Sequence, residues 1–186
     1  LLRGMGLGGW MLMEGYMMQS SDVADTQHEF RERLEDLMGI DKTNAFFDKW
    51  LENHVTKADV DSLSAWGFNS VRLPMHYNLF TLPIEKEPVE GENTWLNKGF
   101  SIVDELLQWC EENQVYLILD LHAAPGGQGA NAAISDYNPD LPSLWESDLN
   151  KNKTIALWKK IAERYKDEEW IGGYDLLNEV NWEMEN

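Results

Sequence analysis

The stretch "WIGGYDLLNEV", residues 170–180, decides the fold because it has the pattern of a buried strand that ends in polar residues. From Gly173 to Val180 it is short, apolar and punctuated by glycine, which is typical of a parallel strand covered on both faces. Alternation along such a strand places Asp175, Leu177 and Glu179 on one face, with Asn178 between the last two. Two carboxylates inside an apolar run need a partner or a ligand.

Two further stretches have the same character, "SVRLPM" at 70–75 and "VYLILDLH" at 115–122, and "LRGMGLGG" at 2–9 is a weaker fourth. Helical patterns lie between them. One apolar stripe comprises Ile102, Val103, Leu106, Leu107 and Cys110, and a second comprises Ile155, Trp158, Ile161, Ala162 and Tyr165. "TKAD" at 56–59 has the spacing of a capping box ahead of another helix. Strands alternating with helices predict an α/β chain with a parallel sheet and right-handed crossovers.

Connection lengths indicate where a site lies. Each return from helix to strand is short, whereas each passage from strand to helix is long, about forty residues after the first strand. That first passage carries two more helical patterns, near 28–38 and 43–53. Extra chain gathered at the carboxyl ends of parallel strands is where α/β enzymes place their sites.

Polar side chains also occupy the ends of the other strands: Arg72 in the second, and Asp120 and His122 in the third. Burying them unpaired would cost several kcal/mol, so we expect them to face one another or a ligand. A purely structural role remains open, in which Arg72 forms an ion pair with Asp120 or Asp175 and His122 is a satisfied core histidine.

Composition excludes several classes of function. Among 186 residues, 33 are acidic and 15 basic, and the net charge of −18 disfavours nucleic acid and anionic membrane surfaces as partners. We expect no metal, because no two histidines have ligand spacing on one helix face, and no cofactor, because "APGGQG" at 124–129 lacks the phosphate-binding signature. His28 and His54 are expected at the surface, and Cys110 in the core.

The residues also resemble a known family. "RGMGLGGWMLMEGYM", "GFNSVRLPMHYNLF", "LILDLHAAPGGQG" and "YDLLNEV" are similar, in order and position, to glycoside hydrolase family 5, the cellulase-type retaining β-glycosidases. The first and third look most like the exo-β-1,3-glucanase branch. The resemblance implies a TIM (β/α)8 barrel, of which this chain holds the first four strands and about three helices. Residues 1–186 are then the N-terminal half of a catalytic domain, with a helical excursion at about 15–54.

The resemblance implies roles as well. Glu179 would be the general acid/base, Asn178 would bind the sugar 2-hydroxyl, and Arg72 would steady the nucleophile. His122 would line the glycone subsite, and Glu14 would contact the terminal sugar. Independently of the family, His76 follows the second strand closely enough to join a site. Aromatic rings on the long loops could stack on sugar faces, or could simply anchor the core: Trp10, Tyr77, Tyr137 and Trp145.

A retaining mechanism needs a second carboxylate, which the family places on its seventh strand, and we expect none in this chain. We therefore expect a substrate of β-linked glucan or oligosaccharide, a partner in the missing C-terminal half of the barrel, and no activity from residues 1–186 alone. Two alternatives stay open: a non-catalytic sugar-binding or interaction module, and a barrel enzyme of unrelated chemistry. The chain opens without a signal-peptide pattern, and a secreted or periplasmic location remains compatible with it.

Overall fold

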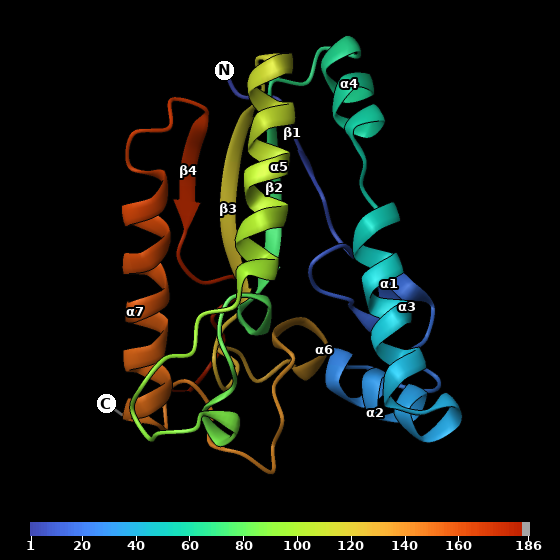
Figure 1. The fold of residues 1–186 in the computed structure, drawn as a ribbon, viewed down its shortest axis with the longest axis vertical. Coiled ribbons are helices and arrows are strands. Elements are labelled where there is room, and N and C mark those ends of the chain that lie inside the picture. The colour runs from blue at the N-terminus through green and yellow to red at the C-terminus, as the bar shows by residue number, and fades with distance from the viewer. Residues whose placement is uncertain (184–186) are drawn as a thin grey trace.

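The computed structural model describes residues 1–183 and shows a four-stranded parallel sheet with the order β1-β2-β3-β4. The strands span Gly4–Gly6, Ser70–His76, Tyr116–Ala123 and Ile171–Asp175. Figure 1 shows α5 (Asn97–Asn113) and α7 (Asp148–Tyr165) beside the sheet, as the crossovers to β3 and β4. With α4 (Lys57–Ala65) leading into β2, the unit repeats strand and helix as half of a (β/α)8 barrel does.

The long passage from β1 to α4 contains three helices, α1 (Gly15–Met18), α2 (Gln27–Met38) and α3 (Ile40–Asn53). The helical patterns predicted near 28–38 and 43–53 correspond to α2 and α3. Thr26 caps α2, since its hydroxyl accepts from the backbone N–H of Glu29 while the Glu29 carboxylate accepts from the N–H of Thr26. The predicted capping box ahead of α4 is also present in part, because the Asp59 carboxylate accepts from both the N–H and the hydroxyl of Thr56.

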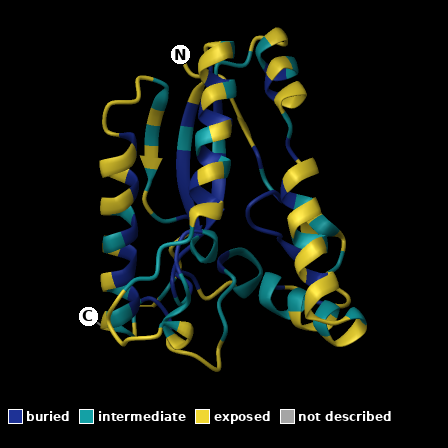
Figure 2. Cartoon of the chain, in the orientation of Figure 1, coloured by how far each residue is buried: buried dark blue, intermediate teal, exposed yellow. Residues whose placement is uncertain are grey.

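The core lies between the sheet and its covering helices, where β2 and β3 are buried along most of their length (Figure 2). The predicted stripe on α5 is confirmed for Val103, Leu106, Leu107 and Cys110, which are buried, whereas Ile102 is half-buried. The stripe predicted on α7 is partly wrong. The buried face of α7 follows Leu157, Ile161 and Tyr165, whereas Ile155 and Ala162 are exposed.

The buried face of α7 also carries a charged residue. Lys153 of α7 is almost fully buried, and its ammonium pairs with the equally buried carboxylate of Glu87 and donates to the hydroxyl of Thr81. Glu87 belongs to the connection between β2 and α5, which also holds the 3-10 helices η1 (Tyr77–Leu79) and η2 (Ile84–Lys86). Hydrophobic periodicity cannot predict a buried ion pair of this kind, although the pair connects α7 to the loop.

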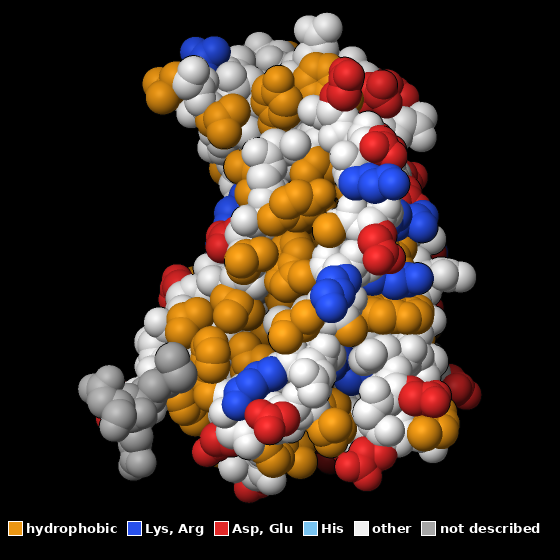
Figure 3. All heavy atoms as spheres, turned by 90° about the vertical axis from the view of Figure 1, so that its left-hand side faces the viewer, with side chains coloured by type: hydrophobic (Ala, Val, Ile, Leu, Met, Phe, Trp, Pro, Cys, Tyr) orange, Lys and Arg blue, Asp and Glu red, His pale blue; other side chains and the backbone are white. Residues whose placement is uncertain are grey.

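The fourth strand is shorter than predicted. It ends at Asp175, so residues 176–180 form an irregular segment rather than the end of a strand. Figure 3 views the side of the molecule formed by α7 and β4, where hydrophobic side chains gather. The exposed large hydrophobic side chains of β4 and of the segment after it include Tyr174, Leu176 and Val180. The free edge of β4 is therefore partly apolar, as expected for a strand that has a neighbour in a closed barrel.

Lys153→Ala should lower the free energy of unfolding by about 3 kcal/mol or more, because it leaves the buried carboxylate of Glu87 without its counter-ion. Urea denaturation followed by circular dichroism measures the loss. Lys159→Ala, on the exposed face of the same helix, is the control and should stay within about 0.5 kcal/mol. Equal stability of the two variants would show that the buried pair contributes nothing.

Candidate active site

The ionisable side chains predicted for the site do meet, and Arg72 is their centre, although it is the third residue of β2 and not at the end of that strand as predicted. Its guanidinium nitrogen Nη2 lies 3.0 Å from Asp120 Oδ2, 2.9 Å from Asp175 Oδ2 and 2.8 Å from Asn178 Oδ1. Asp120 and Asp175 are register partners on β3 and β4, so the parallel sheet itself places them side by side. The arginine therefore joins three strands through charge-assisted hydrogen bonds.

His122, at the end of β3, extends this network towards the first strand. Its Nδ1 lies 2.6 Å from Asp120 Oδ2, and its Nε2 lies 3.4 Å from Glu14 Oε1 and 3.2 Å from Asn178 Nδ2. With Nδ1–H donating to Asp120, a neutral ring would accept from the Asn178 amide at Nε2. A protonated ring would donate to Glu14 instead.

The charges decide between these two states. Burial by itself would lower the pKa of His122, but hydrogen bonds to Asp120 and Glu14 outweigh it and raise the pKa to about 9. The imidazolium is thus the dominant form at neutral pH and its Nε2–H points to Glu14. The Asn178 amide then keeps a donor available for a ligand.

Glu14 lies in the turn before α1, where it is almost fully buried. The next residue must be glycine, because a Cβ on Gly15 would come within 2.7 Å of the carbonyl oxygen of Asp25. Tyr16 donates its hydroxyl to Glu14 Oε1 over 3.3 Å. Burial and the carboxylates of Glu14 and Glu179 raise the pKa of Tyr16.

Glu179 is exposed and has a backbone φ of +44°, a left-handed conformation that is uncommon for glutamate. Its neighbours hold it there. The buried amide of Gln128 donates to the carbonyl oxygens of His122 (2.7 Å) and Asn178 (2.9 Å), and Asn181 Oδ1 accepts from the N–H of Ala130 over 2.8 Å. Backbone strain of this kind persists only where the surroundings impose it, and it concentrates at functional sites.

Other predicted site residues lie elsewhere. The ring of Trp10 is buried and donates to the carbonyl oxygen of Leu51 over 2.8 Å, so it anchors α3 instead of facing the strand ends. Tyr77 is half-buried and packs on His76 with ring centroids 5.1 Å apart. Its burial raises its pKa. Trp145 donates to the carbonyl oxygen of Gln128 over 2.8 Å and supports the loop after β3.

His76 is buried as well, and its Nε2 lies 2.8 Å from Asp136 Oδ2 while its Nδ1 accepts from the N–H of Asn78. The other oxygen of Asp136 lies 2.8 Å from His28 Nδ1. His28, predicted at the surface, is partly exposed and paired with Asp136, whereas the ring of His54 is exposed as predicted and stacks on Trp50. Asp136 thus connects the loop after β3 to α2. Burial alone would raise the pKa of Asp136, but its hydrogen bonds to the two histidines outweigh burial and lower the pKa.

Among the described residues no group of histidine, cysteine and carboxylate side chains has the arrangement of a metal site. No helix of the described chain is long and apolar enough to cross a membrane. Sequence reasoning missed Gln128, Asp136 and Tyr16. The position of Gln128 between two glycine residues was a weak sequence signal for a role in the site, and Asp136 and Tyr16 had no such signal.

Four parallel strands with acidic and basic groups gathered at their carboxyl ends define a barrel-type α/β site. The chain belongs to glycosyl hydrolase family 5: the family's sequence model, described as cellulase, matches residues 24–186.

Three similar proteins match almost the whole chain. It is 36% identical over 179 residues to a β-xylosidase of Phanerodontia chrysosporium, covering 96% of this chain and 36% of the relative. It is 28% identical to a glucan 1,3-β-glucosidase of Candida oleophila, covering 96% of this chain and 42% of the relative. The crystal structure of a rutinosidase from Aspergillus niger shares the fold, with a TM-score of 0.72, 16% identity, and coverage of 96% and 48%. The chain thus spans less than half the length of each.

Replacing Asp120 by asparagine should move the pKa of His122 from about 9 towards its ordinary 6.5, because the shortest hydrogen bond that favours the imidazolium is lost. Titration of the ring by nuclear magnetic resonance measures it. Because the pKa of His122 is higher in the folded protein, its protonation adds to the free energy of unfolding. This contribution is complete below pH 6.5 and is lost as the pH rises through 9. Asp120→Asn should reduce that pH dependence of unfolding, and the part due to Glu14 should remain.

The exposed Asp167→Asn serves as the control, since it changes the charge equally without touching the network. An unaltered His122 titration in Asp120→Asn would contradict the role assigned to this carboxylate.

Proposed function

We propose that the complete protein is a retaining β-glycosidase for β-linked glucans or oligosaccharides, with Glu179 as its general acid/base. The observation that carries the proposal is the exposed Glu179, whose left-handed backbone follows directly on Asn178, a member of the ionised cluster whose carbonyl oxygen accepts from Gln128. Membership of the family supports the reaction class. Cleavage through an oxocarbenium-like transition state needs one carboxyl that donates a proton to the leaving oxygen and one ionised carboxylate across the ring.

The other residues take supporting roles in this proposal. Asn178 offers its amide N–H groups to the sugar 2-hydroxyl, since its carbonyl oxygen already accepts from Arg72. Arg72 has part of its surface open and would steady the second carboxylate. His122 and Glu14 would bind the terminal sugar as a coupled pair. His76 and Trp10 are given positioning roles, because their rings are occupied by Asp136 and Leu51.

We propose further that residues 1–186 are one half of the catalytic domain, and that they supply the acid/base and no nucleophile. The described carboxylates near Glu179 are already engaged: Asp120 and Asp175 with Arg72, and Glu14 with His122 and Tyr16. The alternative, a non-catalytic sugar-binding module, predicts that no further strand-end glutamate is needed for function.

In the complete enzyme, Glu179→Gln should lower turnover of a glucan by about 100-fold to 10,000-fold, because proton donation to a poor leaving group is lost. Azide should partly restore activity on an aryl glycoside with a good leaving group. Glu163→Gln, an exposed change on α7, is the control. Near-normal turnover in Glu179→Gln would remove the assignment.

The substrate class follows from the exo-glucanase resemblance of residues 3–17 and 117–129, and from relatives named as a glucan 1,3-β-glucosidase and a β-xylosidase. We expect release of glucose from β-1,3-linked oligosaccharides to exceed attack on soluble cellulose derivatives. Product analysis by chromatography, with an aryl β-xyloside as a third substrate, measures this preference. Activity on cellulose alone would contradict the exo assignment and leave the reaction class intact.

Residues 1–186 prepared by themselves should hydrolyse no β-glucan, because retaining hydrolysis needs two carboxyl groups about 5–5.5 Å apart on opposite sides of the sugar. The open apolar edge at β4 should also make this polypeptide self-associate. Sedimentation and a hydrolysis assay test both statements. A monomer whose activity depends on Glu179 would show that a carboxylate of this chain, with Glu14 the first candidate, acts as nucleophile.

A further inference from the structure

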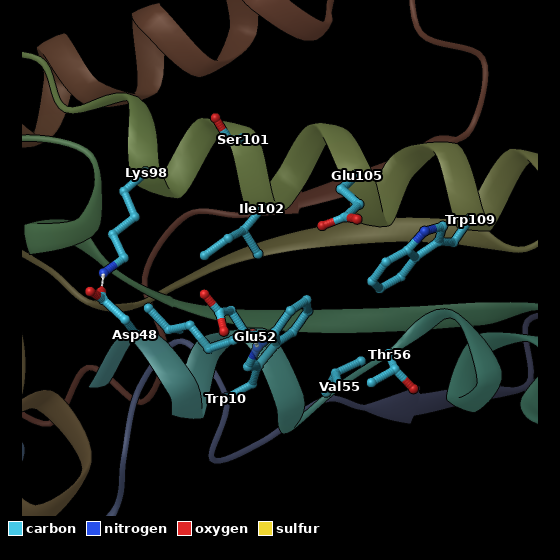
Figure 4. A pocket seen from close by; sticks show the side chains of 11 residues that line it. Trp10, Asp48, Glu52, Val55, Thr56, Lys98, Ser101, Ile102, Glu105 and Trp109 are labelled. Carbon is cyan, nitrogen blue, oxygen red and sulfur yellow. Dashed lines mark hydrogen bonds and ion pairs between the residues drawn. The ribbon is translucent and has the colours of Figure 1, made fainter. Parts of the chain in front are cut away.

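A pocket of about 330 Å³ lies on the outer face of the molecule, between α3 and α5 and away from the strand ends. Its apolar floor is formed by Leu51 of α3, Val55 just after that helix, Ile102 of α5 and the buried ring of Trp10. Figure 4 shows Glu105 and Trp109 of α5 on one side and Glu52 of α3 on the other, around the same space. An apolar floor with a few convergent polar groups is the usual composition of a small-molecule site.

Several polar groups of this pocket are free to bind. Within residues 1–183, no described residue forms a hydrogen bond with the indole N–H of Trp109, the carboxylate of Glu105 or the hydroxyl of Ser101. All three stand on α5, so their spacing is fixed by the helix. Trp109 is half-buried and therefore offers part of its ring as well as its N–H.

The charge of the pocket selects between two kinds of ligand. Asp48 is neutralised by Lys98, and Glu52 by Lys49 on its own helix. Glu105 is then the one uncompensated charge among the lining residues. A strongly cationic ligand would find a single counter-ion here. A neutral polyhydroxylated ligand would find an aromatic ring for its apolar face and carboxylate, hydroxyl and indole groups for its hydroxyls.

We propose that this pocket is a second carbohydrate-binding site, separate from the strand-end cluster, which holds one or two units of a β-glucan chain against Trp109 and Glu105. The ligand class rests on the proposed function. A β-glucan that is cleaved at the strand-end site would present the same sugar units where it lies on α5. Such a site would retain the enzyme on a polymer without taking part in the reaction.

The test uses the complete enzyme with Glu179→Gln as a background that binds without cleaving. Trp109→Ala and Glu105→Gln should each weaken binding to insoluble β-glucan by about tenfold in a depletion assay, the loss expected for one stacking contact or one charged hydrogen bond. Trp66→Ala is the matched control, because Trp66 is an exposed tryptophan outside the pocket. It should bind the polymer normally.

Separate assays in the active enzyme distinguish this site from the catalytic one. Both pocket variants should hydrolyse a short aryl glycoside at the parent rate and degrade insoluble glucan more slowly. Unchanged polymer binding in Glu105→Gln and Trp109→Ala would overturn the proposal. Loss of polymer binding by Trp66→Ala to the same extent would overturn it too. If the aryl glycoside is not cleaved by the parent, the proposed function fails, while polymer binding through Trp109 is still measured.

Discussion

The interaction on which the rest of the site depends is the contact of Arg72 with Asp120 and Asp175. Asp120 is completely buried, and without a cation beside it the inner face of the sheet would hold an isolated negative charge. Because the two aspartates are register partners, any slip between β3 and β4 would separate them and leave Arg72 half-paired. The ion pairs thus stabilise one register of the parallel sheet, and that register sets the position of every residue beyond the strand ends.

Beyond the sheet, the site is formed by loops that are connected to one another by hydrogen bonds. Gln128 joins the end of β3 to the segment after β4, and Asp136 joins the same loop to α2 and to the end of β2. These contacts are made by polar groups inside the protein, where each hydrogen bond is costly to leave unmade. The left-handed backbone at Glu179 is therefore maintained by its surroundings. A side chain held in this way reaches a ligand with little further loss of conformational freedom.

The residues alone predicted a parallel sheet and a cluster in which Arg72, Asp120, His122 and Asp175 face one another or a ligand, because alternation and parallel topology bring them to one side. The half-barrel arrangement of the strands followed from the family resemblance. The sequence was not sufficient for the face of α7, where the charged Lys153 is buried while the apolar Ile155 and Ala162 are exposed. Nor could it give the end of β4 at Asp175 or the pairing of His28 with Asp136, 108 residues away. Both depend on long-range contacts of loops, and hydrophobic periodicity carries no information about those.

The charges of the strand-end cluster also suit the proposed reaction. Arg72 and the imidazolium of His122 contribute two positive charges, and Asp120, Asp175 and Glu14 contribute three negative ones, so the group carries one net negative charge before Glu179 is counted. A sugar that develops positive charge as its glycosidic bond breaks is stabilised by fixed negative charge in a partly dehydrated site. In the proposed reaction an uncharged substrate would gain less from these carboxylates, because protein groups already pair with them. Binding would then favour the transition state over the substrate, which is what catalysis requires.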